Sequence, residues 1–247
     1  MATRILLIRH GEAKGTPRGV LLGRTDRPLS ERGRVQSKRL RGILPRGSAV
    51  RFVSSPLARA RQTAEMATQG CGIAIEIEPD LREVDFGRWE GLTFEQIKER
   101  DAAAVDRWSI SDPGFTFPEG ESLEHFYGRV VRVGDRLAAA EEEIVVAFAH
   151  GGVIRTLLCH FLGLEFRHFL LFELEHASVA SLRLSEGRAT LTAFGSVSPC
   201  DQETRAATPS GWHEMTRLLR SNGYAGKRSL RRGYTAGRGE GSEKGSM

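Results

Sequence analysis

Short apolar runs alternate with amphipathic segments along most of this chain. Five runs have the length and the β-branched or apolar content of strands, and they cover residues 4–8, 50–54, 144–149, 179–184 and 189–194. Helical patterns lie between them, over about residues 30–44, 56–68 and 122–141, and a further one begins after His150. Ser30 and Ser122 are placed to cap two of these helices, and Thr93 and Gln96 form the pattern of a capping box. Strands and helices in alternation predict an α/β domain.

Composition agrees with one domain that is followed by a tail. The chain has 247 residues, 40% of them hydrophobic, which is enough to bury a sizeable core. The formal net charge is +5, of which residues 196–247 carry +4. We therefore expect a domain over residues 1–195, a basic and largely disordered tail over residues 196–247, and no nucleic-acid binding by the domain.

Cysteine usage and hydropathy bear on the compartment. The three cysteines (Cys71, Cys159 and Cys200) are widely spaced, which favours neither a disulfide framework nor a zinc site. No apolar stretch approaches the length of a membrane span, and Arg9 interrupts the opening run. We expect a cytoplasmic protein with no membrane association.

Side chains that could act in catalysis lie at the ends of the predicted strands and helices. The strand over residues 4–8 runs into Arg9 and His10, and the strand over residues 144–149 runs into His150. Ligands bind beyond the carboxyl ends of parallel strands, and the helix that begins after His150 offers an anion site at its N-terminus. With Arg59 and Glu83, these residues suit attack on phosphorus, although each one taken singly is also compatible with an ordinary hydrogen bond or ion pair.

Six sequence blocks make the chain similar to the histidine phosphatase superfamily, which includes phosphoglycerate mutases and α-ribazole phosphatases. In order, the blocks are residues 7–12, 23–33, 54–64, 81–91, 120–122 and 149–152. The resemblance covers about residues 4–195. It implies a three-layer α/β/α sandwich with a mostly parallel central sheet and a small helical lid over about residues 90–120.

The resemblance also implies a role for each candidate residue. His10 would be the nucleophile that forms a phosphohistidine, with Arg9, Arg59 and His150 binding the phosphate oxygens. Glu83 would be the acid that protonates the leaving group and then the base that activates water. The alternative for Glu83 is an ion pair with Arg82, Arg88 or another arginine. Further substrate-binding candidates are Gly11, Gly23, Arg24, Thr25 and Gly151. Neither a metal nor another cofactor is implied.

The predicted lid bears on substrate choice. Its aromatic side chains (Trp89, Trp108, Phe115 and Phe117) could stack on an aromatic leaving group, but packing of the lid is the favoured interpretation. The segment is shorter than the basic insertion of phosphoglycerate mutases, which favours a phosphatase. Residues 86–93 and 118–122 look most like α-ribazole phosphatases of cobalamin biosynthesis. A broad-specificity phosphatase, a mutase and a non-catalytic binding protein stay open as alternatives.

The tail has two further sequence features. Residues 230–237 resemble the start of a cobalt-precorrin methyltransferase, which would suit the remnant of a fusion. Trp212, Met215, Leu218 and Leu219 have the spacing of one short amphipathic helix. The partner we expect is a small phosphate ester, and a homodimer is left open.

Overall fold

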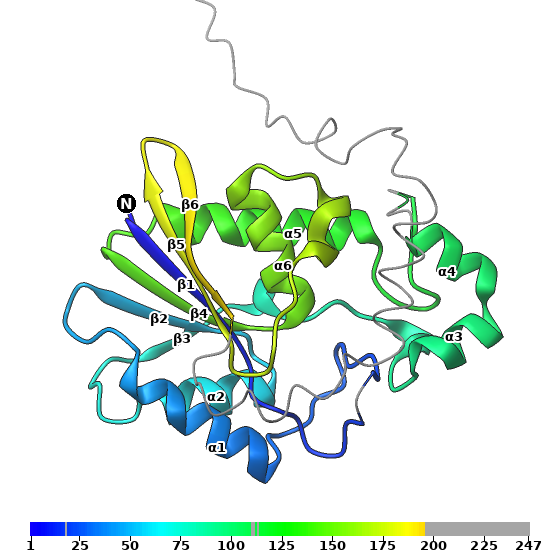
Figure 1. Ribbon diagram of the computed structural model, residues 1–247, viewed down its shortest axis with the longest axis horizontal. Coiled ribbons are helices and arrows are strands. Elements are labelled where there is room, and N and C mark those ends of the chain that lie inside the picture. The colour runs from blue at the N-terminus through cyan, green and yellow to red at the C-terminus, as the bar shows by residue number, and fades with distance from the viewer. Residues whose placement is uncertain (18, 110–111, 113, 196–247) are drawn as a thin grey trace, which may run out of the picture.

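A six-stranded sheet forms the centre of the molecule in the computed structural model, which describes residues 1–195 except 18, 110–111 and 113 (Figure 1). The strands lie in the order β3-β2-β4-β1-β5-β6. Their bounds are β1 Arg4–Arg9, β2 Val50–Ser54, β3 Ile75–Ile77, β4 Ile144–Ala149, β5 Val179–Ser185 and β6 Arg188–Gly195. Strands β1 to β4 are parallel, and only β5 runs antiparallel to both of its neighbours. The mostly parallel sheet is therefore confirmed.

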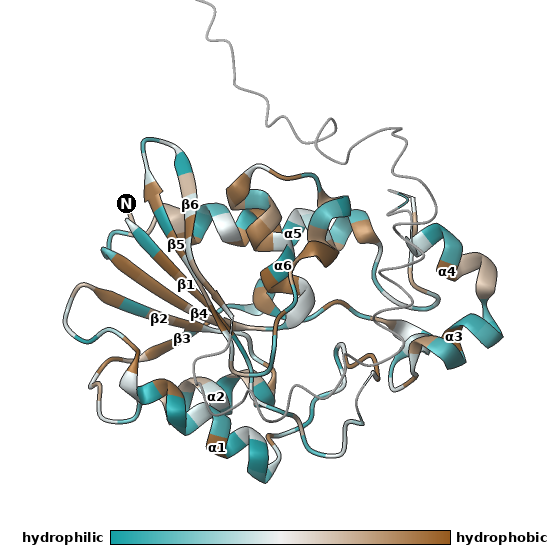
Figure 2. Cartoon of the chain, viewed as in Figure 1, coloured by the Kyte–Doolittle hydropathy of each residue, from teal (hydrophilic) through white to brown (hydrophobic). Residues whose placement is uncertain are grey.

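Helices cover both faces of the sheet and complete the three-layer sandwich. Helices α1 (Glu31–Arg39) and α2 (Ala58–Thr68) lie on one face, and α5 (Leu123–Ala138) and α6 (Gly151–Leu162) lie on the other (Figure 1). Because successive side chains of a strand point to opposite faces, β1 contributes to two hydrophobic cores. Ile5 and Leu7 pack with α5 and α6, whereas Leu6 and Ile8 pack with α2 and with Leu40 and Leu44, which follow α1. The central strands are accordingly apolar along most of their length (Figure 2).

The predicted caps are present, but the helices are shorter than expected. Ser30, Thr93 and Ser122 each accept a hydrogen bond from an N–H of the helix that follows, and Thr93 forms the complete capping box with Gln96. Helix α1 ends at Arg39 and tightens into the 3₁₀ turn η1 (Leu40–Gly42), and α5 ends at Ala138. Three glutamates at 141–143 follow α5, and negative charge at a helix C-terminus opposes the helix dipole.

Two short helices, α3 (Phe94–Arg100) and α4 (Ala102–Ser109), lie beside the sandwich, within the segment predicted to be a lid (Figure 1). The aromatic side chains at its base are buried, and their rings contact one another. Trp89 lies 5.6 Å from Trp108 and 5.4 Å from Phe117, and Phe115 lies 5.0 Å from Phe117, between ring centroids. The packing interpretation of these aromatic residues is therefore confirmed.

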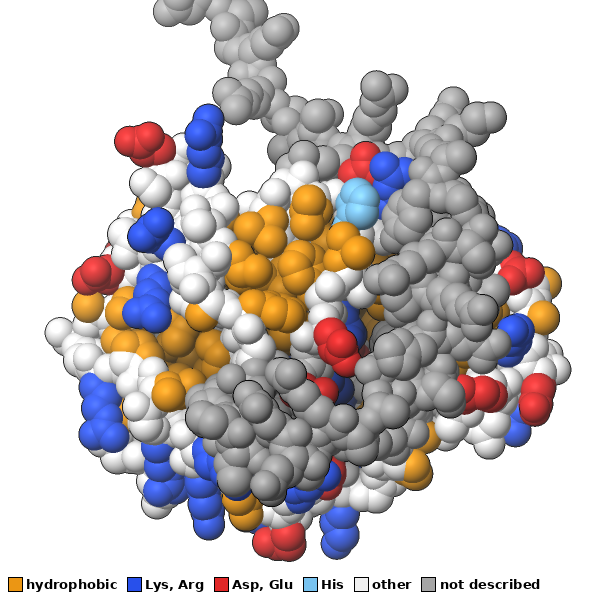
Figure 3. All heavy atoms as spheres, viewed as in Figure 1, with side chains coloured by type: hydrophobic (Ala, Val, Ile, Leu, Met, Phe, Trp, Pro, Cys, Tyr) orange, Lys and Arg blue, Asp and Glu red, His pale blue; other side chains and the backbone are white. Residues whose placement is uncertain are grey.

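The remaining elements are the 3₁₀ turns η2 (Pro79–Leu81), η3 (Gly87–Trp89) and η4 (Phe166–Leu171). Hydrophobic side chains gather over α6 and η4 on the face shown in Figure 3, and Leu171 is one of the exposed ones. Within the described residues, none of the helices is both long enough and apolar enough to cross a bilayer. The expectations for the tail, including the helix near Trp212 and the segment 230–237, lie outside the described residues.

Candidate active site

The two histidines meet because their strands are neighbours in the sheet. Strands β1 and β4 are parallel and pair Arg9 with Ala149, so the next residue of each strand, His10 or His150, falls at the same edge. The ring centroids lie 5.1 Å apart, and both side chains are buried. The carboxyl ends of the central strands therefore hold the candidate site, as the sequence predicted.

His10 has a defined protonation state. Its Nδ1 lies 2.6 Å from the carbonyl oxygen of Gly11, which can only accept, so Nδ1 carries the proton. Its Nε2 accepts a 3.2 Å hydrogen bond from Nε of Arg59. Burial, together with the nearby positive charge of Arg59, holds the pKa of His10 well below its usual value. His10 is thus a neutral imidazole with its lone pair on Nε2.

Arg59 connects the nucleophile candidate to the loop that precedes α1. It lies in the first turn of α2 and is fully buried. Besides its bond to His10, the guanidinium donates to the carbonyl oxygens of Thr25 at 3.0 Å and Gly23 at 2.6 Å. Burial lowers the pKa of Arg59 to about 10, so the group stays charged at neutral pH. A permanent positive charge therefore lies against Nε2 of His10.

His150 occupies the N-cap position of α6, and its ring contacts Ser55, which was not among the residues expected at the site. Its Nε2 lies 2.8 Å from Oγ of Ser55, which also accepts from the N–H of Leu57. Burial and the charge of Arg59 keep the pKa of His150 well below its usual value. Among the described residues, none bonds to the buried Nδ1 of His150. When Ser55 donates to Nε2, the proton of the ring lies on this Nδ1 and makes it a donor.

Arg9 is anchored on one side and unpaired on the other. Its Nη1 donates to the carbonyl oxygen of Leu174, and its Nη2 lies 3.3 Å from Nε2 of His176. The buried Nε has no acceptor within the described part of the chain. Burial lowers the pKa of Arg9, and the charge of Glu83 opposes this shift. Buried donors normally have partners, so the unpaired groups of Arg9 and His150 suit an oxyanion bound between them.

Glu83 lies at the N-terminus of α6, beside the same site. Its carboxylate accepts from the N–H of Gly152 at 2.9 Å and from its neighbour Val84 at 3.1 Å. The alternative partners point elsewhere, because Arg82 donates to the carbonyl oxygen of Pro79 and Arg88 pairs with Glu119. An ion pair with Arg82 or Arg88 is therefore not what holds Glu83.

A buried ion pair behind Glu83 fixes its backbone. Arg129 of α5 makes two hydrogen bonds to the carboxylate of Glu121, at 2.7 and 2.8 Å. Its remaining donors reach the carbonyl oxygens of Asp80, Arg82 and Glu83. Burial acts against the charge of Glu121, but the bond and charge of Arg129 outweigh it and lower the pKa of Glu121. Arg129 thus ties α5 to the segment that carries Glu83.

The backbone amide of Gly11 does not face the site. Its N–H donates to Oγ1 of Thr63 at 3.0 Å, and a side chain on Gly11 would collide with the backbone of Gly33. The expected role of this amide in binding phosphate is therefore not supported, and its carbonyl orients His10 instead. Gly151 agrees better with the expected role in binding phosphate. It is the first residue of α6, and a Cβ added to it would lie 3.7 Å from Nε of Arg9.

The loop over residues 23–25 is organised by Glu90, which we did not identify from the sequence. The carboxylate of Glu90 accepts from the N–H of Gly23, the N–H of Arg24 and the hydroxyl of Thr25. The side chain of Arg24 forms longer ion pairs with Asp85 and Glu121, at 3.8 Å each. The two backbone N–H groups and the hydroxyl of Thr25 are thus used within the protein, and the carbonyls of Gly23 and Thr25 bind Arg59. The buried Nε of Arg24 has no hydrogen-bond partner among the described residues, so Arg24 stays a candidate for binding substrate.

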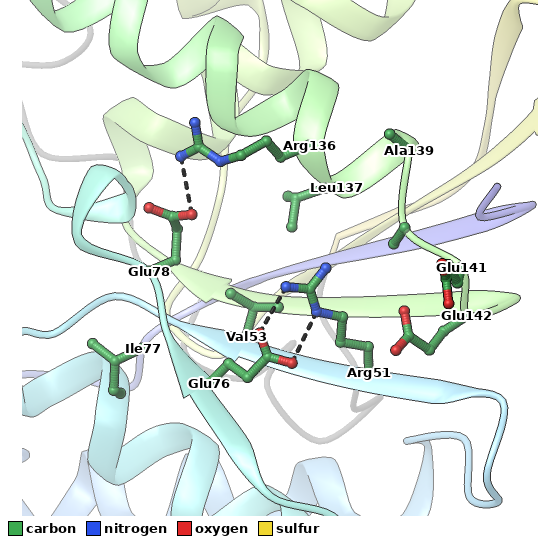
Figure 4. Close-up of a pocket in the computed structure, with 11 residues that line it drawn as sticks. Arg51, Val53, Glu76, Ile77, Glu78, Arg136, Leu137, Ala139, Glu141 and Glu142 are labelled. Atoms are coloured by element: carbon green, nitrogen blue, oxygen red, sulfur yellow. Dashed lines mark hydrogen bonds and ion pairs between the residues drawn. The ribbon is translucent and has the colours of Figure 1, made fainter.

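A separate pocket lies between strands β2 and β3 and the C-terminal end of α5 (Figure 4). Arg51 of β2 and Glu76 of β3 line it and form an ion pair at 2.7 Å, and Arg136 of α5 pairs with Glu78 at 2.9 Å. None of the residues predicted to act on phosphate lines this pocket. Its lining carries four glutamates against two arginines, and this net negative charge disfavours a phosphate ester, which leaves the edge at His10 and His150 as the candidate active site.

Comparisons with known proteins agree with this geometry. The family model described as histidine phosphatase superfamily (branch 1) matches residues 5–196. A bifunctional protein of Mycobacterium tuberculosis is 38% identical over 186 residues, which are 74% of this chain and 50% of that protein. The adenosylcobalamin/alpha-ribazole phosphatase of Salmonella typhimurium is 30% identical over 194 residues, covering 78% of this chain and 96% of that protein. The native structure of a mycobacterial glucosyl-3-phosphoglycerate phosphatase aligns with a TM-score of 0.70 and 28% identity, over 80% of this chain and 100% of that one.

The chain spans about half the length of the first curated relatives that it matches. The family match nevertheless covers nearly all of the described residues. It includes both histidines and both arginines that the fold brings together with Glu83. The chain belongs to the histidine phosphatase superfamily.

Proposed function

We propose that this protein is a phosphomonoester hydrolase that works through a phosphohistidine at His10 and needs no metal ion. The observation that carries the proposal is the tautomer of His10. Its Nδ1 proton is bound to the carbonyl of Gly11, which puts the lone pair on Nε2 in a ring that burial keeps neutral. Nε2 accepts from Nε of Arg59, and this donor turns to the phosphoryl group when His10 attacks. A neutral imidazole in this orientation is a nucleophile.

In the first step, Nε2 of His10 attacks phosphorus and the bond from phosphorus to the ester oxygen breaks. The ring gains positive charge, which the hydrogen bond from Nδ1 to Gly11 stabilises. Arg9, Arg59 and His150 hold the phosphoryl oxygens, and positioning with electrostatic stabilisation supplies most of the catalysis in phosphoryl transfer.

Glu83 serves both steps as the proton carrier. In the first step, its carboxyl gives a proton to the leaving alkoxide. In the second step, the resulting carboxylate takes a proton from water, the water oxygen attacks phosphorus, and the bond to Nε2 breaks. Phosphate leaves, and both His10 and Glu83 return to their starting protonation states.

Two variants test these roles. His10→Ala should abolish both turnover and the acid-labile phosphoenzyme. Glu83→Gln should slow an alkyl phosphate much more than p-nitrophenyl phosphate, because a good leaving group needs little help from an acid. If the rates for both esters fell by the same factor, Glu83 would not be the acid that protonates the leaving group.

For the substrate, we propose α-ribazole 5′-phosphate. The similarity to the alpha-ribazole phosphatase of Salmonella typhimurium extends over 96% of that protein and supports this choice. The similarity to a glucosyl-3-phosphoglycerate phosphatase favours a second candidate, a phosphatase of different or broader specificity.

Phosphate release in the presence of EDTA distinguishes these candidates. The panel is α-ribazole 5′-phosphate, glucosyl-3-phosphoglycerate, 3-phosphoglycerate and p-nitrophenyl phosphate. A large preference in kcat/KM for the first would support the α-ribazole assignment, whereas similar rates would indicate a general phosphatase. Activity that depends on a bisphosphate primer would indicate a mutase, and no turnover at all would favour a binding protein.

A further inference from the structure

A tight turn outside the family motifs wraps around the strand end that carries the nucleophile. It covers residues 174–178, in the connection from η4 to β5 that reaches the carboxyl end of β1 (Figure 1). The N–H of Arg9 donates to the carbonyl of Ser178, and the N–H of Ala177 donates to the carbonyl of His10, both at 3.1 Å. The turn and the strand end are therefore held together by backbone bonds in both directions.

The backbone of this turn is strained. Ala177 has a φ of 57°, in the left-handed region that costs a residue with a side chain about 1–2 kcal/mol. Strain of this kind persists where the surroundings require one particular backbone course, and it often accompanies functional sites. Here the course places the residue before Ala177, which is His176, against both Arg9 and His10.

The contacts of His176 assign it a chemical role. Its ring centroid lies 5.5 Å from that of His10, and its Nε2 lies 3.3 Å from Nη2 of Arg9. A guanidinium can only donate, so Nε2 of His176 is the acceptor in this bond. Together with the carbonyl of Leu174, which accepts from Nη1, His176 holds the outer side of the Arg9 guanidinium.

This anchoring determines which part of Arg9 remains for the substrate. With Nη1 and Nη2 each bonded to the turn, the buried Nε is the group of Arg9 that lacks an acceptor in the described part of the chain. Nε of Arg9 lies beside Gly151, the first residue of α6. A Cβ added to Gly151 would be 3.7 Å from this Nε. The anion site at the N-terminus of a helix is thus next to Nε.

We propose that His176 is a positioning residue that orients Arg9 so that its Nε faces the transferring phosphoryl group. The inference rests on the proposed phosphoryl transfer at His10. His176 itself touches neither phosphorus nor the leaving group. An acceptor at this point fixes the rotation of the guanidinium before substrate arrives, and preorganised charge is what phosphoryl transfer requires.

The test compares His176→Ala with His176→Gln, whose Oε1 can replace the lost acceptor. Misplacing a positioned group by about 1 Å can cost up to about 100-fold in rate, so His176→Ala should lower kcat/KM for p-nitrophenyl phosphate by roughly 10- to 100-fold. His176→Gln should recover most of that loss. His160→Ala is the matched control, because His160 pairs with Asp135 on the surface between α5 and α6 and should leave activity unchanged.

The affinity for inorganic phosphate, measured by calorimetry, separates this inference from the proposed function. His176→Ala should weaken phosphate binding while His176→Gln largely retains it, even if the wild type proves to be catalytically inactive. The proposal is overturned if His176→Ala stays within about twofold of the wild type in both kcat/KM and phosphate affinity. It is also overturned if Ala and Gln are equally impaired while both variants keep the thermal stability of the wild type, since orientation of Arg9 would then not depend on an acceptor.

Discussion

Replacing Arg129 with methionine should destabilise the protein far more than the same change at Arg136, although both arginines lie on α5 and contact the segment around η2. Arg129 is 3% exposed and makes five hydrogen bonds, two to Glu121 and three to backbone carbonyls. Arg136 has a side chain that is 49% exposed, and it pairs with Glu78 and Asp80. The two variants therefore compare a buried network with a solvated one.

The expected magnitudes follow from burial. Arg129→Met removes both hydrogen bonds from arginine to the buried carboxylate of Glu121 and leaves it with His125 at 2.6 Å and the longer contact with Arg24 at 3.8 Å. Loss of one partner of a buried ion pair costs about 3–5 kcal/mol. For a domain of this size, each kcal/mol lowers Tm by about 2–4 °C, so the expected loss is roughly 6–20 °C. Arg136→Met removes exposed ion pairs and should cost about 1 kcal/mol or less.

The free energy of unfolding in urea, with Tm from calorimetry, measures the difference. Adding Glu121→Leu to Arg129→Met should recover part of the loss, because the buried charge is removed together with its partner. If Arg129→Met cost no more than Arg136→Met, the buried pair could not be what holds the segment that carries Glu83.

Three further predictions concern the site itself. Because burial lowers the pKa of His10, its ring should stay neutral as the pH falls through 6.5. The plot of kcat/KM for p-nitrophenyl phosphate against pH should therefore show no acid limb centred at 6.5. A midpoint near 6.5 would contradict the lowered pKa. Gly152→Ala would place a Cβ 2.5 Å from the carboxylate of Glu83 and should lower kcat about 10- to 100-fold, whereas Gly42→Ala, which has open space around it, should not. Ser55→Ala leaves Nε2 of His150 without its partner, at a cost of about 1–3 kcal/mol. The variant should lower kcat/KM about 10-fold or more. An unchanged kcat/KM would show that Ser55 is not needed to orient His150.

Local pattern was enough to predict most of the secondary structure. The apolar run at residues 4–8 became β1 and the run at residues 144–149 became β4, because a strand buried on both faces must be apolar along its length. The caps at Ser30, Thr93 and Ser122 were also predictable, since capping depends on residues that are three apart in the chain. The C-terminal ends of α1 and α5 were less predictable. The three glutamates after α5 and the 3₁₀ turn after α1 end these helices where the local preference for helix is weak.

The sequence by itself determined the layered fold and placed the two candidate histidines at one site. His10 and His150 could be placed at one site because each directly follows an apolar run, and parallel strands bring such positions to the same edge of the sheet. The partners of these groups were decided only by the tertiary structure. Ser55, Glu90 and His176 bond to residues that are 65 or more positions away in the chain. Hydrogen bonds between distant segments leave no periodic signal along the sequence, so only the folded arrangement shows which buried donor meets which acceptor.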